Sequence, residues 1–154
     1  MTKNLAELQQ IVEQGKAPAG SRFDYPPPIA KKLGFKLIAV ELGQATIELY
    51  ADPALHANPM VTIHGGVVCD IADVSIGTAH ATTLDANESF TTLDLQNSFF
   101  RPIWKEKLLA IAKPINLEKT VSRYHCDLLR SDGKLVAQAT STVMTLRGTD
   151  AKGR

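Results

Sequence analysis

The chain has 154 residues, of which 17 are Lys or Arg and 16 are Asp or Glu, so its formal net charge is +1. Hydrophobic residues make up 44% and charged residues 21%, which is ordinary for one globular domain and excludes a disordered chain. The even charge balance excludes a strongly basic nucleic-acid binder and an acidic tail protein. The net charge does not exclude a local basic patch that binds one anionic ligand.

The N-terminal segment predicts a short helix followed by an extended connector. Leu5, Leu8, Ile11 and Val12 recur at helical spacing, so residues 4–14 are expected to form an amphipathic helix. Glycines and prolines then end the helix and disfavour another one. We interpret residues 1–32 as a helical arm with a Pro-rich connector, residues 33–148 as the domain that it covers, and residues 149–154 as a short flexible tail.

Alternating apolar and polar residues predict strands on both sides of one long helix. The expected strands are 35–41, 45–50, 89–100, 107–117, 121–130 and 134–146. Asp132-Gly133 is a strong hairpin signal between the last two, and Pro114 suggests a sheet edge or a strand end. Residues 52–59 are expected to form a loop.

Residues 64–84 predict a helix that is wrapped by other elements, because apolar side chains cover more than one narrow stripe of it. A helix between runs of strands indicates an α+β fold, with an antiparallel sheet curled around that helix. In the strand at 89–100, Leu93, Leu95 and Phe99 share one parity. Thr92, Asp94, Gln96 and Ser98 share the other, and periodicity leaves open whether they face solvent, another subunit or a site.

The helix start carries the first candidate site. Gly65 and Gly66 leave backbone N–H groups bare where the helix dipole is positive, which suits an anion or a developing oxyanion. The alternative is that both glycines only allow close packing. Further along, Asp73 lies among apolar neighbours, where a carboxylate needs partners or a task. Asp70 projects from nearly the same face, so the two carboxylates could share a proton, or both could be solvated surface groups.

Spacing along the helix adds a geometric expectation. At a rise of 1.5 Å per residue, the backbones of Gly65 and Asp73 are roughly 12 Å apart and cannot easily contact one small carbonyl together. Two antiparallel copies of the helix would bring Gly65 of one copy beside Asp73 of the other. If both residues act, the site therefore spans a dimer interface.

Asn58, the tripeptide His64-Gly65-Gly66 and Asp73 together resemble the hot-dog-fold acyl-CoA thioesterases of the phenylacetate-pathway type. The stretch from Thr91 to Pro102 is also similar to that family, and the resemblance covers roughly residues 33–147. It implies a long helix wrapped by an antiparallel sheet of five to six strands, in dimers that commonly pair into tetramers. It also implies hydrolysis of acyl-coenzyme A without a metal or a separate cofactor, since coenzyme A is part of the substrate.

The resemblance also assigns roles to single positions. Asp73 would activate water or attack the thioester carbonyl, and the Gly65 N–H would polarise the carbonyl oxygen. Asn58 and His64 would support that oxyanion site or position the water, and Thr92 would supply a hydroxyl near the carboxylate. Asp70 departs from the family pattern, where an apolar or small neutral residue is more usual, and its charge could raise the pKa of Asp73.

The sequence also suggests roles for several side chains outside this motif. Lys119 and Arg123 are candidates to meet the phosphates of coenzyme A. His56, His80 and His125 are expected to be structural or exposed, and Cys69 and Cys126 to be packed, reduced thiols. Residues that could line an aromatic or medium-chain acyl pocket are Val67, Val68, Ile71, Phe99 and Phe100.

Two other functions compete with the thioesterase. A non-catalytic module that binds acyl-CoA needs no water-activating group, so Asp73 and Thr92 count against it. A hot-dog hydratase needs a His and a carboxylate placed for adjacent carbons, and the order of His64 and Asp73 does not match that motif. The absence of a signal-type or bilayer-spanning apolar segment predicts a cytoplasmic protein.

Overall fold

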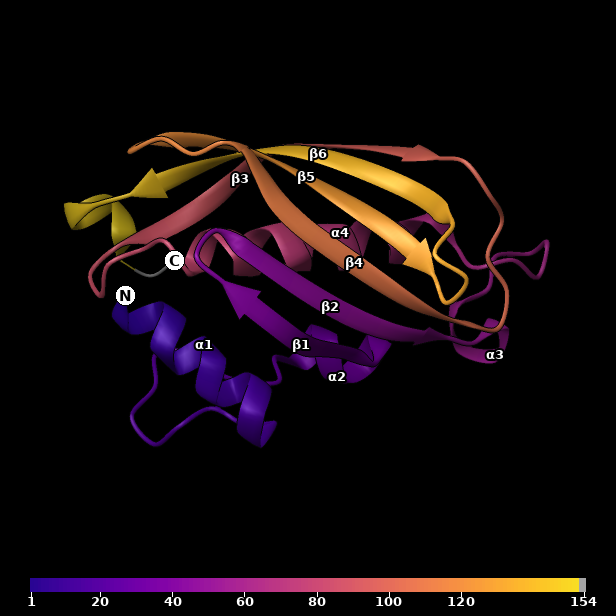
Figure 1. Ribbon diagram of the computed structural model, residues 1–154, viewed down its shortest axis with the longest axis horizontal. Helices are drawn as coiled ribbons and strands as arrows, with labels where there is room; N and C mark the ends of the chain where they lie inside the picture. Colours follow the sequence, from indigo (N-terminus) through magenta and orange to yellow (C-terminus); the bar gives the residue numbers. More distant parts are fainter. Residues whose placement is uncertain (153–154) are drawn as a thin grey trace.

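A six-stranded antiparallel sheet curls around one long helix in the computed structural model, which describes residues 1–152 (Figure 1). This is the α+β hot-dog arrangement expected from the sequence. The elements in chain order are α1 (Lys3–Gln14), α2 (Pro28–Leu33), β1 (Phe35–Glu41), β2 (Gln44–Ala51), α3 (Pro53–His56), α4 (Gly65–Ala81), β3 (Ser89–Phe99), β4 (Glu106–Asn116), β5 (Val121–Arg130), β6 (Leu135–Leu146) and the 3-10 helix η1 (Gly148–Ala151). Residues 153 and 154 of the predicted tail lie outside the described residues.

The sheet order is β1-β2-β4-β5-β6-β3, so β1 and β3 form its two edges. The predicted hairpin joins β5 to β6, and the Asp132 carboxylate closes it by accepting from the Arg130 guanidinium and from the Lys134 N–H. Pro114 pairs with Tyr124 of β5 on one side, whereas β2 pairs with β4 only as far as Ala112. The proline therefore lies beyond the end of a neighbouring strand, where its missing N–H leaves no ladder bond unmade.

Small side chains on the inner face of the sheet let α4 lie close to the strands. Ala110 and Ala112 of β4 and Ala139 of β6 are fully buried beneath the helix, as is Ile76 on the helix itself. Alternating small and large residues let the two layers interdigitate at the density of a protein interior. The predicted wrapping of this helix is confirmed, because its buried residues occur on several turns and sides.

The N-terminal arm covers the β1 edge of the sheet (Figure 1). The Thr2 hydroxyl accepts from the Leu5 N–H as the N-cap of α1 and donates to the Thr82 carbonyl at 2.6 Å. The buried Asn4 amide donates to the Ala81 carbonyl at 3.2 Å. These two bonds tie the start of α1 to the end of α4.

Two short α-helices were not expected from the sequence, and neither was η1 in the predicted tail. The connector stays extended only as far as Pro27, because Pro28 opens α2, and α3 occupies part of the predicted loop at 52–59. Both begin with a proline in the first turn, where the missing N–H costs nothing and the ring fixes a helical φ. The proline-rich composition that argued against a helix therefore marks the start of one in both places.

A β-bulge divides β3 at Leu93. Thr92 pairs with the buried Val143, and the next paired residue, Asp94, faces Thr142 on the other side of β6. The extra residue changes the parity, so Thr92 faces α4 together with Leu95, while Asp94, Gln96 and Ser98 face outward. The expected single polar row is therefore wrong, and the structure divides it between the two faces of the sheet.

Candidate active site

The start of α4 offers one unpartnered backbone donor. The His64 imidazole is the N-cap, and its Nδ1 accepts from the Gly66 N–H at 2.8 Å. The Val67 N–H donates to the His64 carbonyl at 3.0 Å. Within residues 1–152, the Gly65 N–H has no hydrogen-bond acceptor. It therefore stays available where the helix dipole favours a negative charge.

Close packing also explains why both positions are glycine. A Cβ at Gly66 would lie 2.8 Å from Nδ1 of His64, and a Cβ at Gly65 would lie 3.2 Å from the Phe99 ring. The capping imidazole thus excludes a side chain at Gly66, whereas a Cβ at Gly65 requires the Phe99 ring to move by a few tenths of an ångström. The two interpretations of the Gly-Gly pair are compatible, because within residues 1–152 the Gly65 N–H has no acceptor although the Phe99 ring packs beside this residue.

Asn58 orders the loop that leads into α4. Its Oδ1 accepts from the Met60 N–H at 2.9 Å and from the Thr62 N–H at 3.3 Å, and its Nδ2 donates to the Thr62 hydroxyl at 2.9 Å. These bonds hold a tight turn in which Val61 takes a φ of 66°. In this chain Asn58 therefore positions the segment just before His64.

Asp73 lies on α4 and is half-buried against β3. Its Oδ1 accepts from the Thr92 hydroxyl at 3.3 Å. Burial raises the pKa of the Asp73 carboxyl, the bond from Thr92 lowers it, and the negative charge of Asp70 raises it. Asp70 itself is exposed. The bulge at Leu93 makes the contact possible, because it points Thr92 toward the helix.

The face of α4 that meets β3 is a row of residues spaced by one helical turn. Each member lies against one side chain on the inner face of the strand, in antiparallel order. The pairs are Gly65 with Phe99, Cys69 with Asn97, Asp73 with Thr92 and Gly77 with Phe90. Both the bare N–H and the half-buried carboxylate therefore lie along the side of the helix that follows the uncovered sheet edge.

A cavity of about 340 Å³ opens beside Asp73. Asp73 and Thr92 form part of its wall, with Gly77 and Thr78 of α4 and Phe90 of β3. The opposite wall comes from β1 and from the N-terminal arm, chiefly Leu8, Phe23, Tyr25, Pro27 and Ala30. The expected lining residues Val67, Val68, Ile71, Phe99 and Phe100 lie elsewhere. Val68 and Ile71 point into the core, and the wall that faces α4 here comes from the arm instead.

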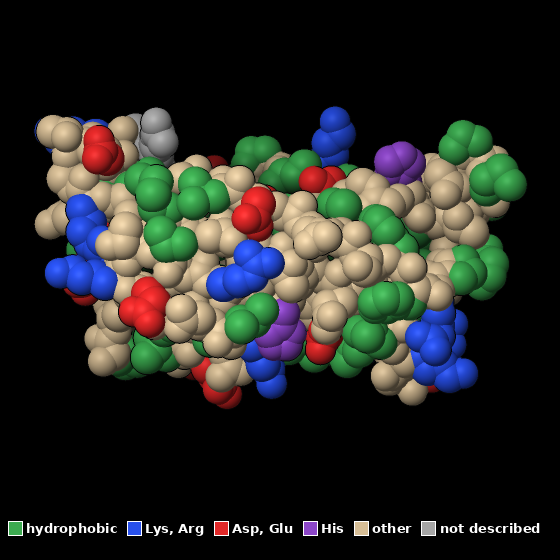
Figure 2. All heavy atoms as spheres, turned by 90° about the horizontal axis from the view of Figure 1, so that it is seen from above, with side chains coloured by type: hydrophobic (Ala, Val, Ile, Leu, Met, Phe, Trp, Pro, Cys, Tyr) green, Lys and Arg blue, Asp and Glu red, His purple; other side chains and the backbone are tan. Residues whose placement is uncertain are grey.

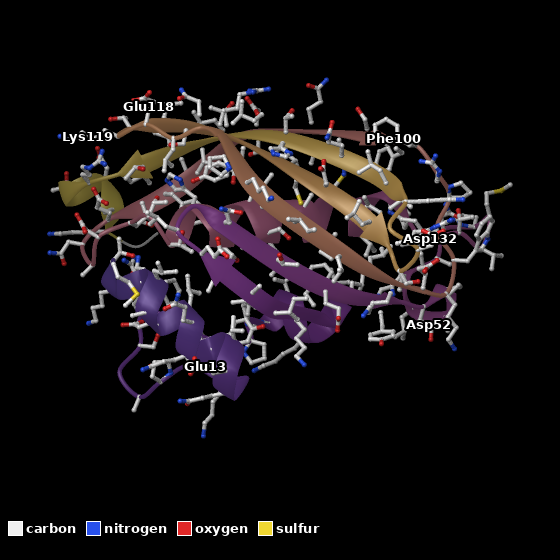
Figure 3. All side chains as sticks on the ribbon, in the orientation of Figure 1. Glu13, Asp52, Phe100, Glu118, Lys119 and Asp132 are labelled. Carbon is white, nitrogen blue, oxygen red and sulfur yellow. The ribbon has the colours of Figure 1, made fainter. Side chains whose placement is uncertain are left out.

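The two cations assigned to coenzyme A lie outside this cavity. The Arg123 guanidinium is on the outer face of β5, where it donates to the Thr142 hydroxyl at 2.8 Å. Lys119 lies in the loop before β5, at the opposite end of the molecule from Phe100 (Figure 3). On the face that Figure 2 shows, basic, acidic and apolar side chains are interspersed. A phosphate contact to either cation stays a prediction.

The other histidines are structural or partly exposed, as expected, and both cysteines are free. Both ring nitrogens of the buried His56 are bonded to backbone groups. His80 is buried as well, and His125 lies half-buried on the outer face, with its Nδ1 3.7 Å from Asp127. Cys69 and Cys126 are both free thiols, and burial raises the pKa of Cys126 to about 12.

Residues 1–152 contain no group of three or more His, Cys, Asp or Glu side chains arranged to hold a metal ion. None of the described helices has the length and apolar character needed to span a bilayer.

The sequence pattern of the thioesterase superfamily matches residues 60–137, a segment that contains α4, β3, β4 and β5. The chain belongs to the thioesterase superfamily. Members of this superfamily are thioester hydrolases, and the segment that identifies this member carries Gly65, Asp73 and Thr92. The matched segment excludes the arm that closes the cavity.

Solved structures extend the match to nearly the whole chain. A phenylacetic acid degradation-related protein from Ralstonia eutropha JMP134 is 28% identical, with a TM-score of 0.74 over 90% of this chain and 98% of that one. A variant of the phenylacetic acid degradation protein PaaI from Thermus thermophilus is also 28% identical, with a TM-score of 0.71 over 77% and 98%. The PaaI protein of E. coli shares the fold at 19% identity, with a TM-score of 0.78 over 96% and 99%.

Proposed function

We propose that this thioesterase hydrolyses acyl-coenzyme A to a free acid and coenzyme A, with Asp73 as the catalytic carboxylate. The observation that carries the proposal is the half-buried Asp73 in the wall of a mainly apolar cavity, bonded to Thr92. A carboxylate there can act on a carbonyl while the acyl chain is buried beside it. Its raised pKa makes it a stronger base than a solvated Asp, which suits activation of water.

The reaction needs one base and one oxyanion donor. Asp73 removes a proton from water as the water oxygen attacks the thioester carbonyl, or the carboxylate attacks directly and water then hydrolyses the resulting anhydride. In both routes the carbonyl oxygen gains negative charge, which the N–H of Gly65 stabilises. The C–S bond then breaks and coenzyme A leaves as a thiolate, which takes up a proton. Thr92 orients the carboxylate, and His64 and Asn58 hold the helix start in place.

A second copy of the chain completes this site. The edge strand β3 is 11 residues long, and apolar side chains such as Leu93 and Phe99 are 53% and 56% exposed along it. Such an edge favours strand pairing with another copy. Two copies paired about a two-fold axis would run their α4 helices antiparallel, with Gly65 of one near Asp73 of the other. A homodimer, and a homotetramer of such dimers, are therefore the proposed assemblies, with Lys119 and Arg123 as proposed contacts for the coenzyme A phosphates.

The release of free thiol tests the reaction. The full chain is assayed with acyl-CoAs from acetyl to palmitoyl and with phenylacetyl-CoA, and an enzyme blank corrects for Cys69 and Cys126. Wild type releases thiol, Asp73→Asn loses about 10³-fold in kcat/KM, and Asp70→Asn keeps its activity near pH 8. Absence of turnover on every substrate, together with tight acyl-CoA binding, would instead make the chain a binding module.

Mixed dimers test whether two copies share the site. Gly65→Pro removes the N–H while suiting the first helical position, and Gly65→Ala is the control that adds a Cβ but keeps the N–H. Co-expressed Asp73→Asn and Gly65→Pro chains recover about a quarter of wild-type activity, since one site in each mixed dimer has both groups. A site within one chain would give no recovery.

A further inference from the structure

The cavity beside Asp73 has a wall that the superfamily segment does not supply. Residues 60–137 provide the helix side, with Asp73, Thr78 and Phe90. The other side comes from the arm, where Phe23 and Tyr25 of the connector lie across from the helix. The catalytic groups and the opposite wall therefore come from separate parts of the sequence.

Hydrogen bonds fix the connector in place. The Tyr25 hydroxyl accepts from the Leu37 N–H of β1 at 2.7 Å. The Arg22 guanidinium donates to the Ala86 carbonyl, beyond the end of α4, at 3.0 Å. The Ser21 hydroxyl donates to Glu7 of α1 at 2.7 Å. The wall is thus attached to β1, to the segment after α4 and to α1, so the cavity has a defined size.

The charges on the cavity wall have one sign. Among its lining residues, only Asp24 and Asp73 are charged, and none is Lys, Arg or His. With Asp73 at the carbonyl end, a terminal carboxylate on the acyl group would find no cation among these lining residues to pair with, which disfavours it in a desolvated site. The lining therefore favours uncharged acyl groups.

The volume limits the length of the group. One water molecule occupies about 30 Å³ in the liquid, and one methylene group occupies nearly the same volume. A cavity of about 340 Å³ therefore holds roughly eleven such groups. An octanoyl or a phenylacetyl group, each of about nine non-hydrogen atoms, fits this space, and a palmitoyl group of about seventeen would extend beyond it.

We propose that the connector, through Phe23 and Tyr25, sets the upper size of the acyl group and makes the enzyme selective for uncharged acyl-CoAs of medium size. This inference rests on the proposed thioesterase function. Phe23 and Tyr25 are specificity-determining residues, and they act by closing the cavity rather than by touching the carbonyl.

A chain-length profile with matched variants tests the inference. For wild type, kcat/KM rises about fourfold per added methylene up to the octanoyl group and then falls. Hexanoyl-CoA is preferred over adipyl-CoA, which has the same length and a terminal carboxylate, by at least about 100-fold. Phe23→Ala moves the optimum to longer chains, and Thr78→Leu, which fills the cavity from the helix side, moves it to shorter ones.

Val12→Ala is the matched control, because Val12 packs against the same core from α1 without lining the cavity. Its profile stays that of wild type, and thermal unfolding verifies that each variant is folded. Hydrolysis with the same profile in Phe23→Ala, Thr78→Leu and wild type overturns the role of the connector and leaves the thioesterase function standing. Absence of hydrolysis of any acyl-CoA by wild type overturns both.

Discussion

Asp73 and His80 are two titratable side chains of α4, and their surroundings differ in a way that separates function from structure. Both ring nitrogens of the buried His80 are engaged, with Tyr124 at 3.0 Å and Thr145 at 2.9 Å, and aromatic rings pack on its edges. Asp73 is half-buried, has one hydrogen bond of 3.3 Å and lines a cavity. The histidine is closed off by the protein, and the carboxylate stays open to a ligand.

Burial favours the neutral form of both groups, but the consequence for function differs. It lowers the pKa of His80 to about 4, so the imidazole is neutral in the folded protein and serves as a hydrogen-bonding part of the core. It raises the pKa of Asp73, while the group keeps unfilled lone pairs that face the cavity. A perturbed pKa alone would single out both residues, and only the unfilled hydrogen-bonding capacity distinguishes them.

The largest effect, on stability, is expected when the hydrogen bonds of His80 to Tyr124 and Thr145 are removed. His80→Ala removes a ring from a filled core and leaves the hydroxyls of Tyr124 and Thr145 without their partner, so the free energy of unfolding falls by about 4 kcal/mol. Urea unfolding measures this change, and kcat/KM of the folded protein stays within about twofold. His125→Ala on the outer face is the control, at about 0.5 kcal/mol or less. Lost activity with unchanged stability would place His80 in the reaction instead.

The pH dependence of stability is expected to separate the two groups by sign. Between pH 6.5 and about 4 the unfolded chain protonates His80 and the folded chain does not, so acid removes as much as about 3 kcal/mol of stability. Asp73 contributes in the opposite direction, because its raised pKa lets the folded form bind a proton that the unfolded form releases. Urea unfolding across this range shows a weaker acid loss in His80→Gln and a stronger one in Asp73→Asn. Identical curves for both variants would contradict the assignment.

A smaller effect, on activity, is expected when the hydrogen bond from Thr92 to Asp73 is removed. Thr92→Val deletes the hydroxyl that Asp73 accepts from, so kcat/KM falls about fivefold. The acid limb of the pH–rate profile also moves to higher pH, because that bond lowers the pKa of Asp73. Thr91→Val is the matched control on the outward face of β3. An equal loss in the control would show that the strand, and not the contact, matters.

The smallest effect is expected at Asp70, whose charge raises the pKa of Asp73 without any direct bond. Asp70→Asn moves the acid limb of kcat/KM to lower pH and leaves the plateau at higher pH unchanged. A pH–rate profile at low ionic strength measures this shift, since salt screens the interaction between the two carboxylates. A shift toward higher pH would contradict the coupling.

Periodicity and turn signals predicted most of the fold. The order of strands and helix, the hairpin at Asp132-Gly133 and the wrapping of α4 follow from patterns that extend over many residues, so one exceptional position does not disturb them. The short helices α2 and α3 were missed because they contain few residues and begin with proline, a residue that otherwise argues for extended chain.

The site was harder to predict where it depends on a single residue or on distant segments. The bulge at Leu93 inverts the parity of β3, and no local pattern indicated it, so the orientation of Thr92 rested on resemblance alone. The part of Phe23 and Tyr25 in the cavity wall could not be predicted, because only the folded arm brings them opposite α4. Gly65 and Asp73, in contrast, could be placed on one helix from their spacing, because the rise of a helix is fixed.

The connector is held mainly by hydrogen bonds to backbone groups of residues 33–148, which form the body of the domain. These groups are the Leu37 N–H and the Ala86 carbonyl. Backbone groups are the same whatever the sequence, so this docking would tolerate many exchanges of residues in the body. Connectors from relatives could therefore be transplanted onto this body, as interchangeable parts that alter the size of the acyl group. The groups that act on the carbonyl would stay untouched, and new acyl preferences could be engineered without rebuilding the chemistry.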